Sequence, residues 1–262
     1  MKIIDKNSNK HLSEAAKHLN STSCALALTG AGISVGSGIA DFRSPGGLWS
    51  RFSPEEYATL EVFLHNPKKA WQLYRKLGRE LQGKNPNKGH RVLADLESRG
   101  ILKGIITQNV DNLHQAAGSR KVLEIHGDHQ HLRCLQCGSG IPVTDNHYSM
   151  EGVPKCELCS YPLKPDIVLF GEAVKNLDEI QMLVSSCDLL LVIGTSAKVY
   201  PAAGIPEMVR QQGGKIYEFN QEQTLSSSGF SGHSPLSDYF FKGDLDSTLP
   251  LFSKAVFGKK AC

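Results

Sequence analysis

The sequence lacks the long apolar segments and dense charge runs that mark membrane proteins and nucleic-acid-binding proteins. Its longest apolar run, Leu189–Ile193, has five residues, far fewer than the roughly 20 that span a bilayer. The first ten residues hold no apolar core of the length that a signal peptide needs. The formal net charge is only +3, and Lys and Arg form no dense cluster. We therefore expect a cytoplasmic protein that binds neither membranes nor nucleic acid.

The sequence also lacks internal repeats, low-complexity domains and the pattern of a disulfide scaffold. Seven cysteines would suit a short secreted chain, but this chain has 262 residues and no predicted signal peptide. Four of the cysteines form two close pairs, so metal binding explains them better than disulfides do. With 40% hydrophobic residues, the chain can bury the core of one large α/β domain or two small ones.

Helix and strand patterns alternate along the chain. Several strands are continuous apolar runs, which is typical of a parallel sheet covered by helices on both faces. Ser53, Pro54 and Glu56 form a capping box that opens a helix reaching to about residue 64. The serine-rich segment 226–235 is predicted to be a surface loop. Strands are expected at 24–28, 101–107, 122–125, 166–170, 189–193 and 215–219, and further helices at 12–19, 67–81, 90–97 and 177–185.

Polar residues follow four of the predicted strands, directly after Leu28, Ile106, Ile193 and Phe219. In a parallel sheet these strand ends lie along one edge, and ligands bind there. The sequence therefore predicts one binding site built from all four clusters.

The first cluster is rich in glycine: "GAGISVGSGIADFR", residues 30–43. Gly30, Gly32, Gly36 and Gly38 fit a turn that lets backbone N–H groups approach a diphosphate. The third glycine comes one position late for a dehydrogenase fingerprint, and no acid stands at the end of a second strand about twenty residues on. Single glycines usually serve only a tight bend, but the run of small residues from Gly30 to Ser34 favours the diphosphate interpretation. Asp41, Phe42 and Arg43 fit a solvated loop and a functional loop about equally well.

The cysteine pairs are Cys134-x-x-Cys137 and Cys156-x-x-Cys159, separated by eighteen residues. This is the spacing of a tetrahedral zinc site made by two short turns. Four thiolates leave no open coordination position, so the zinc is expected to be structural. His129 and His131 lie nearby and are expected to be solvated rather than to replace a thiolate. Loss of one ligand should unfold this small module.

Seven motifs in register resemble the sirtuins, which are NAD-dependent protein-lysine deacylases, and the chain looks most like their prokaryotic-type members. The agreement extends from about residue 20 to residue 252. The resemblance implies one catalytic domain over 1–262 and a monomer. It divides the chain into a Rossmann-like NAD-binding part (1–46, 88–126 and 164–262), a helical insertion (47–87) and a zinc-binding module (127–163). The motifs are "GAGISVGSGIADFR", "TQNVDNLH", "EIHGDHQHLRC", the cysteine pairs, "KPDIVLFGE", "GTSAKVYPAA" and "FN" at Phe219.

The resemblance implies that NAD is consumed: nicotinamide leaves the ribose, and the acyl oxygen of a modified lysine attacks the anomeric carbon. The products would be nicotinamide, O-acyl-ADP-ribose and free lysine. His126 would be the general base, a role that suits imidazole near neutral pH. Asn109 and Asp111 would hold the nicotinamide carboxamide. Two alternatives remain open: a protein mono-ADP-ribosyltransferase, and a non-catalytic protein that binds NAD and zinc.

The same resemblance implies contacts for both substrates. Asp41 would fix the glycine-rich loop, Gln108 would contact ribose, and Phe42 would shield the reactive carbon. Acylated peptide would add a strand between two segments, 170–172 and 198–200. The residues implied for NAD are Gly30, Ala31, Gly32, Ile33, Asp41, Phe42, Arg43, Trp49, Gln108, Asn109, Val110, Asp111, Gly194, Thr195, Ser196, Asn220 and Leu245; those implied for acyl-lysine peptide are Phe42, His126, Val168, Phe170, Gly171, Glu172 and Val199.

One position in the helical insertion bears on which acyl group the enzyme would prefer. Sirtuins that prefer succinyl or malonyl lysine carry Tyr-x-x-Arg there, and in this chain Tyr74 is followed at that spacing by Leu77. Arg75 and Arg79 stand at other spacings. We therefore expect acetyl or longer neutral acyl chains to be preferred.

Overall fold

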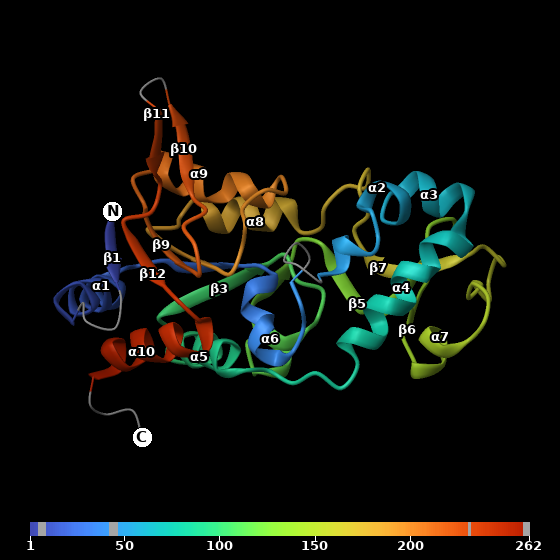
Figure 1. Cartoon of the computed structure of the whole chain (residues 1–262), viewed down its shortest axis with the longest axis horizontal. Helices are drawn as coiled ribbons and strands as arrows, with labels where there is room; N and C mark the ends of the chain where they lie inside the picture. Colours follow the sequence, from blue (N-terminus) through green and yellow to red (C-terminus); the bar gives the residue numbers. More distant parts are fainter. Residues whose placement is uncertain (5–8, 42–46, 230–231, 259–262) are drawn as a thin grey trace.

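Seven parallel strands form the central sheet of the structure, and they confirm the predicted fold class (Figure 1). The computed structural model describes residues 1–4, 9–41, 47–229 and 232–258. The sheet order is β1 (Lys2–Ile4), β12 (Tyr239–Lys242), β9 (Lys215–Asn220), β8 (Leu189–Ile193), β2 (Ala25–Thr29), β3 (Leu102–Thr107) and β4 (Val122–Glu124). Every neighbouring pair is parallel, so all carboxyl ends lie along one edge.

Helices cover both faces of this sheet. Along β2, Ala25 and Ala27 point to one core, whereas Leu26 and Leu28 point to another. This is why the strand is a continuous apolar run with no polar face. The first core packs against α1 (Asn9–Ser21), α5 (Lys88–Ser98) and α10 (Leu245–Phe257), and the second against α8 (Leu177–Val184) and α9 (Ile205–Gln211). None of the described helices is long and apolar enough to cross a bilayer.

A smaller lobe lies beyond the carboxyl edge of the sheet, at the right of Figure 1. It holds an antiparallel sheet ordered β6 (Gly140–Pro142), β5 (Gly127–Cys134) and β7 (Leu163–Ile167). Trp71 is fully buried, and its Nε1 donates to Leu163 O at 2.8 Å. The helices and the cysteine segment therefore share one core. The helices of this lobe are α2 (Pro54–Tyr57), α3 (Leu60–His65), α4 (Pro67–Leu81) and α7 (Asp145–Ser149).

The predicted helix from Ser53 to about residue 64 is wrong, because the structure holds two short helices there, α2 and α3. The chain breaks at Thr59, which pairs with Phe170. Phe170 N donates to Ala58 O, and Leu60 N donates to Phe170 O, both at 2.9 Å. Ser53 Oγ donates to Glu55 instead of capping the helix. A pairing with a distant segment therefore overrides the local helix signal.

Two further segments differ from expectation. The predicted surface loop at 226–235 contains an antiparallel hairpin, β10 (Ser226–Gly229) with β11 (Gly232–Pro235). Its serines and glycines carry no hydrophobic alternation from which a strand could be predicted. The strand predicted at 166–170 begins earlier, as β7, and joins the antiparallel sheet of the smaller lobe. Three short elements follow strands: η1 (Ala31–Ser37) follows β2, α6 (Leu113–Ala116) follows β3, and η3 (Ala202–Gly204) follows β8, where η denotes a 3-10 helix. A further 3-10 helix, η2 (Leu48–Ser50), packs through Leu48 in the core of the smaller lobe.

Candidate functional site

A cavity of about 790 Å³ lies at the carboxyl ends of the parallel strands. Gly30 after β2, Gln108 after β3, Gly194 after β8 and Asn220 at the end of β9 all line it. The predicted meeting of the four polar clusters is therefore confirmed. The cavity continues to residues of the smaller lobe, including Leu77.

The glycines of the first turn are required by close packing against the turn after β8. A Cβ on Gly32 would lie 2.7 Å from Gly194 Cα, and one on Gly30 would lie 2.8 Å from Thr195 Cβ. Gly32 N donates to Gly194 O at 2.8 Å, and Gly194 itself has a φ of +59°. Any side chain would force the two turns apart. The glycines thus bring two strand ends together at the cavity, and Ala31 lines it between them.

The segment after β3 is tied to this glycine-rich turn by its side chains. Asn109 Nδ2 donates to Gly30 O at 3.2 Å and to Ser34 Oγ at 3.1 Å. Gln108 Nε2 donates to Thr195 Oγ1 at 2.8 Å. Asn109 is 5% exposed, so these bonds are shielded from water. Three strand ends are held in one rigid arrangement.

Most of the predicted site residues line the cavity, but two lie behind its wall. Ile33 is buried in the core under the sheet. Asp111 uses both carboxylate oxygens, accepting from Ser34 Oγ at 2.6 Å and from Leu113 N at 3.0 Å. Phe42 and Arg43 lie outside the described residues. The predicted residues that line the cavity are Gly30, Ala31, Gly32, Asp41, Trp49, Gln108, Asn109, Val110, His126, Val168, Phe170, Gly171, Glu172, Gly194, Thr195, Ser196, Val199, Asn220 and Leu245.

His126 lies on the cavity wall where β4 leads into β5. Its Nδ1 lies 3.0 Å from Gln108 O, which can only accept, so Nδ1 carries the hydrogen. Nε2 is then the atom with a free lone pair. Burial lowers the pKa of His126 below its ordinary value of 6.5, and the bond to Gln108 opposes that shift. A neutral imidazole held in one tautomer is suited to accept a proton.

The part of the cavity near the smaller lobe has an apolar wall that sequence reasoning mostly missed. Leu48, Leu73, Leu77, Ile167 and Leu169 line it. Only Leu77 was identified from the sequence, through its spacing from Tyr74; each of the other four has the pattern of an ordinary core residue, so no local signal could have identified them. Polar lining residues that were also missed are Gln221, Glu222, Thr224 and Asp244, whereas Tyr200 lines the cavity within the segment 198–200 that was expected to pair with the peptide.

Glu172 in the "FGE" segment is held by a buried ion pair. Its Oε2 lies 3.1 Å from Lys164 Nζ and accepts from Leu169 N at 2.7 Å. The Lys164 side chain is 3% exposed. Burial lowers the pKa of Lys164, while the Glu172 carboxylate opposes that shift. This pair fixes the backbone just beside the partly exposed Phe170.

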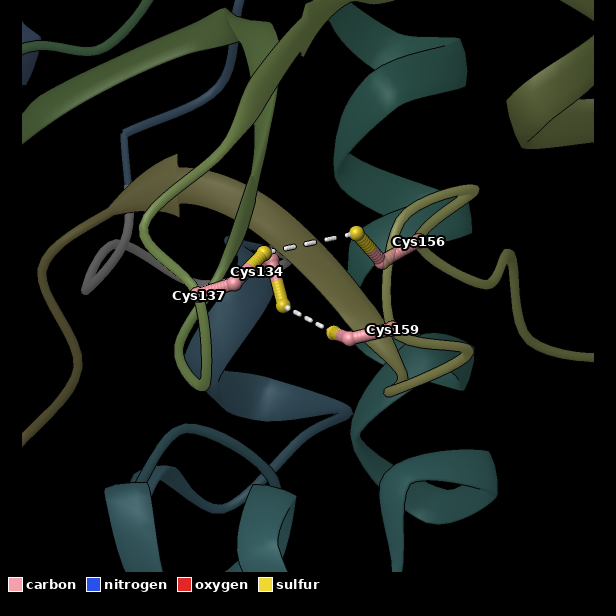
Figure 2. Close-up of side chains that lie close together, drawn as sticks. All are labelled: Cys134, Cys137, Cys156 and Cys159. Carbon is pink, nitrogen blue, oxygen red and sulfur yellow. Dashed lines mark hydrogen bonds between the residues drawn. The ribbon is translucent and has the colours of Figure 1, made fainter.

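The four paired cysteines come together in the smaller lobe (Figure 2). Their sulfurs all lie within 4.8 Å of one another, with Cys134 and Cys159 3.4 Å apart and Cys137 and Cys156 3.6 Å apart. A tetrahedron with Zn–S bonds of about 2.3 Å needs sulfurs roughly 3.8 Å apart, so the donor set fits zinc.

The nearby histidines do not join this cluster. His131 is exposed and pairs with Asp128, as expected of a solvated residue. The expectation for His129 is wrong: its Nδ1 lies 2.7 Å from Val110 O, and the burial of the ring lowers its pKa. Val110 lines the cavity, so His129 joins the smaller lobe to the site.

Comparison with known proteins gives consistent matches. Residues 30–201 match the model of the Sir2 family. An NAD-dependent protein deacylase of Thermococcus kodakarensis is 42% identical over 252 residues, covering 94% of this chain and 95% of that protein. A solved Sir2 homologue in complex with NAD has a TM-score of 0.83 at 37% identity and covers 93% of each chain. A solved Sir2 complex with a p53 peptide and NAD has a TM-score of 0.79 at 32% identity, covering 90% of this chain and 95% of that one.

Proposed function

This chain belongs to the Sir2 family, and on that premise we propose that its cavity carries out the NAD-dependent removal of neutral acyl groups from protein lysines. The enzyme is an NAD-dependent protein deacylase, as its relatives are. One observation carries the assignment of roles. His126 is held on the wall of the cavity that the glycine-rich turn and Asn109 also line, with Nε2 bonded to none of the described residues.

The residues along the sheet edge would bind NAD. The lining residues at the ends of β8 and β9, which are Gly194 to Ser196 and Asn220, would offer backbone and polar groups for the adenosine side. When bound, NAD supplies an anomeric carbon from which nicotinamide can leave. Asn109 has committed its amide nitrogen to Gly30 and Ser34, so its oxygen would accept from the nicotinamide carboxamide. Asp111 would act one step back, by orienting Ser34.

His126 would take a proton from a ribose hydroxyl at Nε2. Its Nδ1–H stays on Gln108 O, which stabilises the ring when the proton arrives. The acyl oxygen and the anomeric carbon would meet beside this ring, where the protein walls exclude water and align them. The peptide backbone would pair with the segment that the Lys164–Glu172 ion pair holds.

The four cysteines would hold one structural zinc, and the helical insertion would carry most of the apolar wall, through Leu48, Leu73 and Leu77. Leu77 lies in that wall, and Leu73 lies one helical turn before it. An uncharged acyl chain buries its surface there at no electrostatic cost, whereas a succinyl or malonyl carboxylate would be desolvated without a partner.

Mass spectrometry of an acetyl-lysine peptide tests the function directly. With NAD, the enzyme should release free lysine, nicotinamide and O-acetyl-ADP-ribose in equal amounts, and without NAD nothing should change. Deacetylation that needs no NAD would contradict the proposal. Labelled NAD that leaves ADP-ribose on protein without deacylation would favour mono-ADP-ribosyl transfer, and no nicotinamide release at all would favour a non-catalytic protein.

Leu77→Arg should shift the acyl preference. A cation in the apolar wall would pair with an acyl carboxylate, and a charge-assisted hydrogen bond of about 1.5–3 kcal/mol corresponds to roughly 10- to 100-fold. We expect the ratio of kcat/KM for succinyl-lysine over acetyl-lysine peptide to rise by that factor. Leu77→Met is the matched control and should keep the wild-type ratio. An unchanged ratio in Leu77→Arg would show that this position does not face the acyl group.

A further inference from the structure

A chain of buried polar side chains lies behind the cavity, where β2 and β3 end. Thr29 and Thr107 are the last residues of these strands and pair in register. Thr29 Oγ1 donates to Thr107 Oγ1 at 2.8 Å, and His114 Nε2 on α6 lies 2.9 Å from Thr29 Oγ1. The N–H of Asn109 donates to Thr107 Oγ1 at 3.1 Å. The three side chains are at most 2% exposed.

The hydrogen count fixes the direction of this chain. The hydroxyl of Thr29 has one hydrogen and gives it to Thr107, so it must accept from His114. His114 therefore carries its hydrogen on Nε2. Burial lowers the pKa of His114 to about 3, which keeps the ring neutral at physiological pH. A neutral ring in one tautomer is a permanent donor to Thr29.

A second arm connects the same region to the glycine-rich turn. His90 packs edge-on against His114, with ring centroids 4.9 Å apart, and its Nδ1 lies 2.9 Å from Asn87 Oδ1. Asn87 Nδ2 donates to Ile33 O at 2.6 Å. Burial lowers the pKa of His90 to about 4. These two arms therefore hold the backbone at Ile33 O and at the N–H of Asn109, and Ile33 directly precedes Ser34, to which the Asn109 side chain donates.

These residues do not touch the cavity, so any effect on chemistry must pass through others. None of Thr29, Thr107 and His114 belongs to the cavity lining within the described residues, whereas Asn109 does. Leu28 and Ile106, the residues just before the two threonines, are fully buried apolar side chains that need no hydrogen-bond partner. A polar chain at the strand ends is thus not needed to fill the core.

We propose that Thr29, Thr107 and His114 are positioning residues for NAD cleavage, because together they set the backbone of Asn109 and so the place of its side chain beside the leaving nicotinamide. The proposal rests on the proposed function. We expect these hydrogen bonds to affect kcat rather than substrate binding, because the proposed contacts with peptide and adenosine lie on other elements.

The test replaces Thr107 by valine, which keeps the shape and removes the hydroxyl. We expect kcat for nicotinamide release to fall about 10- to 100-fold, as small misplacements of catalytic groups do. KM for acetyl-lysine peptide and Kd for ADP-ribose, which lacks nicotinamide, should change less than about 2-fold. Thr107→Ser should restore kcat. Thr29→Val and the double variant should match Thr107→Val without adding to it, because the residues act as one unit.

Ser119→Ala is the matched control, because Ser119 is buried close to His114 in sequence and its hydroxyl bonds to no described residue. It should leave kcat unchanged. ADP-ribose titration counts the folded sites. A variant that is partly unfolded therefore shows fewer sites, whereas kcat per folded site stays at the wild-type value. Wild-type kcat in Thr107→Val at full site count would overturn the positioning role while leaving the deacylase function intact. Wild-type enzyme that releases no nicotinamide would overturn both.

Discussion

His126→Ala is expected to lower kcat for deacylation by roughly 10²- to 10⁴-fold, the usual contribution of a general base. The ring bonds to Gln108 O through Nδ1 and keeps Nε2 for the ribose hydroxyl. Alanine removes that acceptor but leaves the glycine-rich turn and its bonds to Asn109 in place. ADP-ribose affinity should therefore stay close to wild type. Steady-state kinetics with an acetyl-lysine peptide, together with ADP-ribose titration, measure the two effects.

The pH profile supplies a second signature of the same residue. Burial lowers the pKa of His126 below 6.5, and the ring can accept a proton only above its pKa, where it is neutral. The acid limb of kcat/KM, which reports the free enzyme, should thus have its midpoint below pH 6.5 and should be missing from the residual activity of His126→Ala. His131→Ala removes an exposed histidine that pairs with Asp128 and should change neither kcat nor the profile. A midpoint above pH 7, or a wild-type kcat in His126→Ala, would remove His126 from the chemistry.

The parts of the fold that local patterns determine were predictable. Residues 189–193 are apolar at every position because both faces of β8 are buried, and the predicted strand has the observed bounds. The helix from Pro67 was also predicted to its last residue. The break at Thr59 was not, since it depends on pairing with Phe170, more than a hundred residues away. An isolated bridge of this kind, outside any regular strand, leaves no local pattern in the sequence.

Site residues could be predicted where a polar side chain follows a predicted strand, and most residues of the apolar wall could not. Polar residues after strands identify the cavity edge, which Asn109 and His126 line as expected. Leu48 and Leu73 were missed because a leucine that lines an acyl site has the same pattern as a core leucine. Thr29 was missed because threonine is common in strands. Its partners become visible only when β2 and β3 are placed side by side.

Removing zinc is expected to cost the most stability of any change considered. Apparent zinc-binding free energies of about 10–16 kcal/mol match or exceed the whole stability of a typical domain, about 5–15 kcal/mol. Cys134 and Cys156 belong to the core that also holds Trp71 on α4. Cys156→Ser, or treatment with a strong chelator, should therefore unfold the smaller lobe. Metal analysis should find one zinc per wild-type chain, and thermal unfolding followed by circular dichroism should show the loss.

Because this lobe contributes to the cavity, the order in which activity and fold are lost distinguishes a structural metal from a catalytic one. β7 pairs with Cys134 on β5 and ends at Ile167, two residues before Leu169, and both Ile167 and Leu169 line the apolar wall. Activity should thus disappear in step with the fold, at the chelator concentration that unfolds the lobe. Cys24→Ser is the matched control, since Cys24 lies outside the cluster and contacts Ser186, and it should keep both zinc and activity. A zinc-free chain of unchanged thermal stability would contradict the structural role. Activity that is lost before any unfolding would point instead to a metal that takes part in the reaction.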